Sequence, residues 1–170
     1  PKGVDPMREL VPVIALADLI LMLAVSAPFP ARTLDQFVAK AREMGPKLRI
    51  GLAGIGTPHH LTVLMIQRAL GLEMTMVPYK GGPPMIADLV TGRLDFGLLS
   101  YIAAKPHMDD KKLKGLVIDS DVRIEQIATV PTLIEAGLAK ERVANWFGLA
   151  APAGTPNALV QKLHAEFVKA

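Results

Sequence analysis

The sequence contains no cysteine, which excludes a disulfide scaffold and every thiolate metal site. It has only three serines, Ser26, Ser100 and Ser120, and none lies in a G-x-S-x-G segment that would present a nucleophile. Aromatic residues make up only 5% of the chain, and the basic residues behind its net charge of +3 alternate with acids. The composition therefore favours neither nucleophilic catalysis nor nucleic-acid binding.

Metal and nucleotide motifs are also missing. His59 and His60 are neighbours, and on a helix neighbouring side chains diverge, so the pair cannot chelate a metal from one face. The segment from Gly54 to Gly56 lacks the third glycine of a dinucleotide fingerprint, and Lys80 does not complete a phosphate-binding loop. We therefore expect no metal, no cofactor and no enzymatic activity.

A long apolar run from Leu10 to Ala27 raises the question of a membrane span. Pro12 and Asp18 interrupt it, and an aspartate at the centre of a span costs about 2.5–3.5 kcal/mol. The run is better divided into two core strands, residues 11–17 and 19–26. Because the chain begins at Pro1 without a charged leader, we expect any targeting segment to be removed or to lie outside this chain.

The rest of the chain alternates between strand and helix patterns. Expected strands are residues 48–53, 73–77, 94–99, 114–119 and 147–151. Expected helices begin near Thr33, Thr57, Pro83, Thr132 and Pro156, of which the first and fourth carry a capping box with Gln36 and Glu135. This alternation predicts an α/β fold with mostly parallel strands, whose ligands bind at the carboxyl ends of the strands.

Two glycine-containing bends follow such strand ends. Gly54, Gly56 and Thr57 precede one helix, and Lys80, Gly81 and Gly82 precede the next. Glycine lets the backbone approach a ligand closely, and the N–H groups of a helix start favour an anion, so the two bends could together hold a carboxylate. Glycine and proline also begin helices that bind nothing. Lys80 is equally consistent with a solvated lysine, and Tyr79 with a ring that covers the core.

Several motifs in a fixed order resemble a known family, the Bug-type solute receptors of tripartite tricarboxylate transporters. They cover nearly the whole chain: Asp5-Pro6, Pro30-Ala31-Arg32-Thr33-Leu34, Gly54-x-Gly56-Thr57-x-x-His60-Leu61, Val77-Pro78-Tyr79-Lys80-Gly81-Gly82, Asp88-Leu89, Gly92-Arg93-Leu94-Asp95, Val130-Pro131-Thr132, Glu135-Ala136-Gly137, Trp146-Phe147-Gly148-Leu149 and Ala151-Pro152-Ala153-Gly154-Thr155-Pro156.

The resemblance implies an α/β, two-lobed, periplasmic-binding-protein-like (type II) architecture with solute held between the lobes. Residues 1–76 and 146–170 would form lobe 1, and residues 77–145 would form lobe 2. The implied protein is a periplasmic receptor that captures a small organic carboxylate, delivers it to the permease subunits of a membrane transporter and catalyses nothing. Carried onto this sequence, the ligand-binding residues are Gly54, Gly56, Thr57, His60, Tyr79, Lys80, Gly81, Gly82 and Ser100.

Two departures from the family pattern add expectations. The pattern has further segments before Pro1 and after Ala170, so we expect lobe 1 to be incomplete. The chain would then be a fragment, a proteolysed species, or paired with another chain, for example by self-association. Leu99 stands where the family often has an acid, which favours a plain carboxylic acid over an amino acid as solute. An alternative to transport is a ligand-sensing or interaction domain that retains the same fold.

Overall fold

A computed structural model describes residues 5–169, and these residues form two units. The larger unit spans residues 20–144, and the smaller one combines the described residues up to Leu19 with those from Asn145 onward. The expected boundary between residues 76 and 77 falls inside a strand of the larger unit, Thr75–Pro78, which pairs with Arg49–Leu52 in one sheet, so the structure divides the chain at other positions. Residues 1–4 and 170 of the expected lobe 1 lie outside the described residues.

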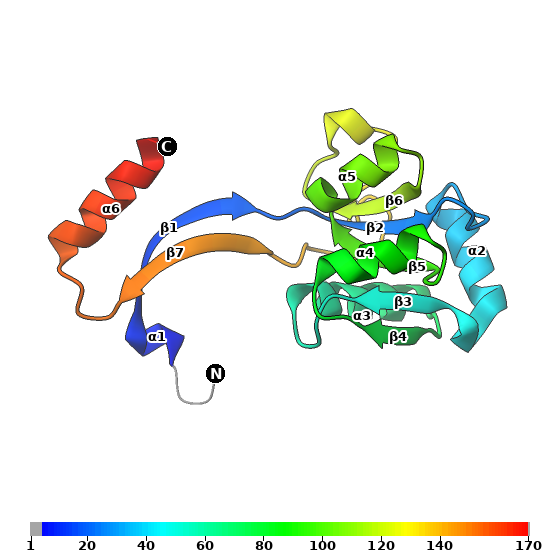
Figure 1. Ribbon diagram of the computed structural model, residues 1–170, viewed down its shortest axis with the longest axis horizontal. Helices are drawn as coiled ribbons and strands as arrows, with labels where there is room; N and C mark the ends of the chain where they lie inside the picture. The colour runs from blue at the N-terminus through cyan, green and yellow to red at the C-terminus, as the bar shows by residue number, and fades with distance from the viewer. Residues whose placement is uncertain (1–4, 170) are drawn as a thin grey trace. The chain divides into compact units, whose positions relative to one another are not determined.

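The larger unit is built on a five-stranded sheet of order β4-β3-β5-β2-β6 (Figure 1). Its strands are β2 (Leu21–Ser26), β3 (Arg49–Leu52), β4 (Thr75–Pro78), β5 (Phe96–Ser100) and β6 (Leu113–Asp119). β3 is parallel to both β4 and β5, whereas β2 runs antiparallel to its neighbours β5 and β6. The expected α/β class is confirmed. The sheet is not mostly parallel as expected, because β2 is antiparallel to both of its neighbours.

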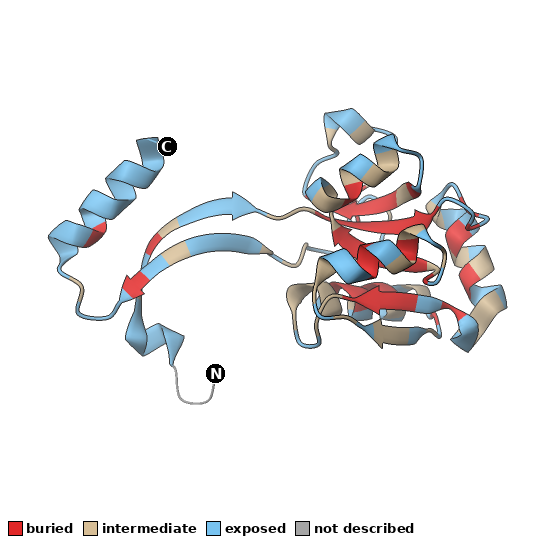
Figure 2. Ribbon diagram, viewed as in Figure 1, coloured by how far each residue is buried: buried red, intermediate tan, exposed pale blue. Residues whose placement is uncertain are grey.

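Helices cover both faces of this sheet. They are α2 (Leu34–Met44), α3 (Pro58–Leu70), α4 (Gly82–Val90) and α5 (Tyr101–Asp109), with short 3-10 turns η1 (Gly45–Lys47) and η2 (Glu125–Ile127). Residues of α4 and α5 pack on one face against Met22 and Leu99, and residues of α3 pack on the other against Leu23 and Leu98. All six residues of β2 are consequently buried, as Figure 2 shows in red.

The helix boundaries follow from local chemistry. Thr57 caps α3 by accepting a hydrogen bond from the His60 N–H, and Gly71 ends that helix in the left-handed conformation. Thr33 caps α2 in the same way. The expected helix at Thr132 is reduced to a single turn, because Gly137 follows with φ of 68° and ends it.

The smaller unit contains a two-stranded antiparallel sheet of β1 (Leu10–Asp18) and β7 (Trp146–Pro152), with α1 (Pro6–Glu9) and α6 (Asn157–Lys169). Its buried hydrophobic residues are Val13, Ala151 and Val160. The expected strand at residues 11–17 therefore forms, but it is not a core strand, since most of β1 is exposed (Figure 2). No helix among the described residues is both long enough and apolar enough to cross a membrane.

Candidate functional site

The two predicted bends lie beside each other at one end of the larger unit's sheet, where the parallel strands β3, β4 and β5 have their carboxyl ends. The first bend, residues 53–57, joins β3 to α3, and the second bend, residues 79–81, joins β4 to α4. Because β3 and β4 are parallel neighbours, both bends leave the sheet at the carboxyl ends of adjacent strands, which lie about 4.8 Å apart. The bends thus belong to the same unit, not to opposite lobes as the sequence led us to expect.

Side chains within the first bend satisfy some of its polar groups. The Thr57 hydroxyl donates to the Gly54 carbonyl at 3.0 Å, and the Gly56 N–H donates to Nδ1 of His60 at 3.1 Å. Gly56 is therefore not a free donor in this structure. Among the described residues none accepts a hydrogen bond from the main-chain N–H of Thr57 or His59, and these two groups remain for an anion.

The second bend leaves more donors free. No group in the described part of the chain accepts from the main-chain N–H of Lys80, Gly81 or Gly82, and the prolines that follow have no N–H. Gly81 has φ of 106° and ψ of −179°, a conformation open essentially to glycine alone. Because glycine has no side chain, the N-terminus of α4 has no side-chain cap, and an anion can take the place of the cap.

Lys80 is the one charged residue within the two bends. Lys80 is exposed, and none of the described carboxylates forms an ion pair with it. Burial lowers the pKa of the His59 imidazole below its ordinary value, which favours the neutral ring at pH 7. The main-chain N–H groups and one lysine are therefore the groups that would attract a carboxylate.

Two other predicted residues have different surroundings. The Tyr79 hydroxyl donates to Oδ2 of Asp88 at 2.8 Å and is therefore already paired. Ser100 is the last residue of β5, at the same end of the sheet, and caps α5, accepting from the Ala103 N–H at 3.3 Å. Leu99 is 2% exposed and packs in the core, so its side chain faces other core residues. The preference for a plain carboxylic acid over an amino acid stays a prediction.

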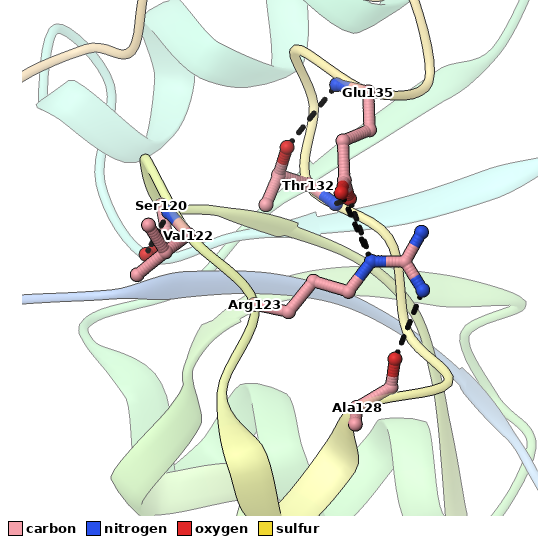
Figure 3. A network of polar contacts seen from close by, with 6 residues as sticks. All are labelled: Ser120, Val122, Arg123, Ala128, Thr132 and Glu135. Atoms are coloured by element: carbon pink, nitrogen blue, oxygen red, sulfur yellow. Dashed lines mark hydrogen bonds and ion pairs between the residues drawn. The ribbon is translucent and has the colours of Figure 1, made fainter.

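The chain that follows β6 is held by its own polar network (Figure 3). Nε of Arg123 donates to both carboxylate oxygens of Glu135, and Nη1 donates to the Ala128 carbonyl at 2.9 Å. The hydrogen bond from the Thr132 N–H, followed by that from Arg123, lowers the pKa of the Glu135 carboxyl below its ordinary value. Arg123 is thus engaged within the protein and is not a free cation for a solute.

A groove of about 570 Å³ lies at the other end of the strands, where β6 begins. Arg32, Lys111 and Lys114 contribute its charged lining, and neither bend does. Within the larger unit the bends are therefore a surface site, separate from this groove.

Comparison with known proteins places the chain in a family. Residues 3–170 match the family model described as "Tripartite tricarboxylate transporter family receptor". This chain belongs to that receptor family. The expected resemblance is confirmed.

Among curated relatives, a UPF0065 protein from the tcbD-tcbE intergenic region of Pseudomonas sp. strain P51 is 37% identical over 96% of this chain and 49% of its own length. Protein BugT of Bordetella pertussis is 28% identical over 93% of this chain and 48% of its own length. The chain thus spans about half the length of the curated relatives it matches.

Solved structures of related proteins carry small carboxylates. R. palustris Rpa4515 with adipate is 30% identical and superposes with a TM-score of 0.90, covering 98% of this chain and 56% of the other. MatC from Rhodopseudomonas palustris with bound malate is 32% identical with a TM-score of 0.86, covering 99% of this chain and 58% of the other. The fold is that of periplasmic binding proteins, and these matches describe binding proteins rather than enzymes.

Sequence reasoning did not assign a role to Asp88 or Arg93. Both stood in the motifs that carry the family resemblance, and that was the only signal for them. The structure adds that Asp88 lies within hydrogen-bond distance of a residue of the second bend.

Proposed function

We propose that this chain is the solute-binding part of a periplasmic receptor that captures a small organic carboxylate and delivers it to the permease subunits of a tripartite transporter. The observation that carries the proposal is the cluster of unpaired main-chain N–H groups on two adjacent bends, in a member of a receptor family. The adipate and malate bound to related proteins support a carboxylate as the solute class.

The site chemistry suits capture and release. A hydrogen bond to a charged group contributes about 1.5–3 kcal/mol net, so a few N–H donors give micromolar binding without making release slow. Lys80 adds long-range attraction for an anion, and its exposure keeps that attraction weak and sensitive to salt.

The first test is a thermal-shift screen of small mono- and dicarboxylates on the natural protein, at whatever length the cell makes it. A solute present at one hundred times its dissociation constant is expected to raise the free energy of unfolding by about 2.7 kcal/mol. The matching neutral amides serve as controls and should give no shift. Stabilisation by the amides equal to that by the acids would contradict carboxylate recognition.

Delivery to a permease needs a separate measurement. Cells that lack the gene should take up the labelled solute more slowly, and the gene should restore uptake. Normal uptake together with tight binding would favour the sensing alternative over transport.

His60 provides a second prediction, because its Nδ1 accepts the Gly56 N–H and so fixes the first bend. His60→Asn keeps an acceptor near the position of Nδ1, whereas His60→Gln moves the acceptor further along the side chain. We expect the glutamine variant to bind solute about three- to tenfold more weakly and the asparagine variant to bind within about twofold of the parent. Calorimetric titration measures both, and equal affinities for the two variants would show that the Gly56 contact does not matter.

A further inference from the structure

The second bend is held at both of its ends. Tyr79, at its entry, donates its main-chain N–H to the Leu52 carbonyl at 2.8 Å, which ties it to the strand that leads into the first bend. The same residue donates its hydroxyl to Asp88, which lies on α4 beyond the exit of the bend. The three free N–H groups of Lys80, Gly81 and Gly82 lie between these two attachments.

The Asp88 carboxylate is in turn held by Arg93. Nη1 of Arg93 donates to Oδ1 of Asp88 at 3.0 Å, and the Arg93 main-chain N–H donates to the Asp88 carbonyl at 2.9 Å. The two carboxylate oxygens therefore have different partners, Tyr79 and Arg93. The hydrogen bond from Tyr79, followed by that from Arg93, lowers the pKa of Asp88 below its ordinary value, so the acceptor is ionised throughout the physiological range.

This arrangement differs from a solute contact. The Tyr79 hydroxyl has a single proton, which it donates to Asp88 at a good hydrogen-bond distance, so it has none left to donate to a solute carboxylate. The ring of Tyr79 also packs against the core cluster that includes Met85 and Leu89 of α4. The hydroxyl and the ring thus both attach the bend to the helix that follows it.

Building on the proposed function, we propose that Tyr79, Asp88 and Arg93 form a positioning brace, which holds the N–H groups of the second bend in the geometry that receives the solute carboxylate. Tyr79 acts through Asp88 and does not itself contact the solute. This changes the role that the sequence suggested for Tyr79.

The experiment compares solute affinity in the natural protein and in the variants Tyr79→Phe, Asp88→Asn and the double variant, with adipate and malate as the probes. Tyr79→Phe keeps the ring and removes only the hydroxyl. Tyr101→Phe is the matched control, because the Tyr101 hydroxyl is buried and has no hydrogen-bond partner among the described residues. Calorimetric titration gives the affinities, and ultraviolet titration of the tyrosines gives an independent signature of the brace.

We expect Tyr79→Phe and Asp88→Asn each to weaken binding about three- to tenfold, with the double variant no weaker than either single variant, and Tyr101→Phe to stay within about twofold of the parent. Burial, followed by the hydrogen bond to Asp88 and its charge, raises the pKa of Tyr79 above 10.0. The titration of Tyr79, taken as the difference between each protein that has Tyr79 and its Tyr79→Phe counterpart, should move to lower pH in Asp88→Asn.

The outcomes separate the two proposals. If the parent binds neither these probes nor any other small carboxylate, the proposed function fails, and the brace fails with it. If the parent binds and Tyr79→Phe binds equally well, only the brace is wrong. If Tyr79→Phe weakens binding while Asp88→Asn does not, Tyr79 contacts the solute directly and the brace is again wrong.

Discussion

Replacing Gly81 by alanine is expected to weaken solute binding by about tenfold or more. A residue with a side chain that is held at φ of 106° and ψ of −179° carries a backbone strain of about 1–3 kcal/mol. The second bend is therefore expected to move to a more favourable backbone conformation. An added Cβ would meet no atom within 4 Å, and the effect therefore comes from backbone strain and not from a clash. Because the bend's N–H groups turn away with the backbone, binding falls along with stability.

Gly82→Ala is the matched control. Gly82 is the first residue of α4, has no positive φ, and also has open space around the position of a Cβ. Alanine favours the helix, so this variant should be as stable as the parent or slightly more so, with its N–H still in place. Calorimetric titration and chemical denaturation of both variants give the comparison. Equal solute affinities for Gly81→Ala and Gly82→Ala would rule out the second bend as a carboxylate site.

The parts of this fold that sequence predicts well depend on a few adjacent residues. Thr57 and Gly71 mark the two ends of α3 because capping and a left-handed stop are local chemistry. The capping box at Thr132 also forms, since Glu135 donates its N–H to Oγ1 of Thr132 and accepts the Thr132 N–H. The box fixes where the short helix starts, and Gly137 ends it after a single turn.

Other features depend on distant parts of the chain. α5 was not predicted, since it contains Pro106 and buries only Ala104, so its sequence carries little helical periodicity. The direction of β2 was also missed, because an apolar run of residues does not reveal whether its neighbours are parallel. Long-range packing decides both.

In the candidate site, too, local features could be predicted and long-range ones could not. The unusual backbone conformation at Gly81 could be expected because it depends on one residue being glycine. The sequence did not reveal that β3 and β4 pair, and so it placed the two bends in different lobes. For Tyr79 the sequence left open both a solute contact and a ring that covers the core. The motif gives the residue type without showing where its hydroxyl points, and that depends on Asp88.

The largest effect on stability is expected for Phe37→Ala. Phe37 is fully buried on α2, and its ring centroid lies 5.8 Å from that of Phe29 and 5.0 Å from that of Phe96. Removing it leaves a cavity between the helix and the sheet, which costs about 3–5 kcal/mol of the free energy of unfolding. Val38→Ala, a partly buried neighbour on the same helix, should cost about 1 kcal/mol or less.

The Phe37 variant also tests whether the stability of the fold can fall without a change in the solute affinity of the site. Phe96 begins β5, at the end of the strand opposite to Ser100, so the aromatic cluster lies away from the end of the sheet that carries the two bends. Urea denaturation followed by circular dichroism should show the loss of stability, and solute affinity measured below the transition should stay within about twofold of the parent. If affinity falls in proportion to stability, the geometry of the bends is set by the whole core of the larger unit rather than by glycine conformation and the local hydrogen bonds.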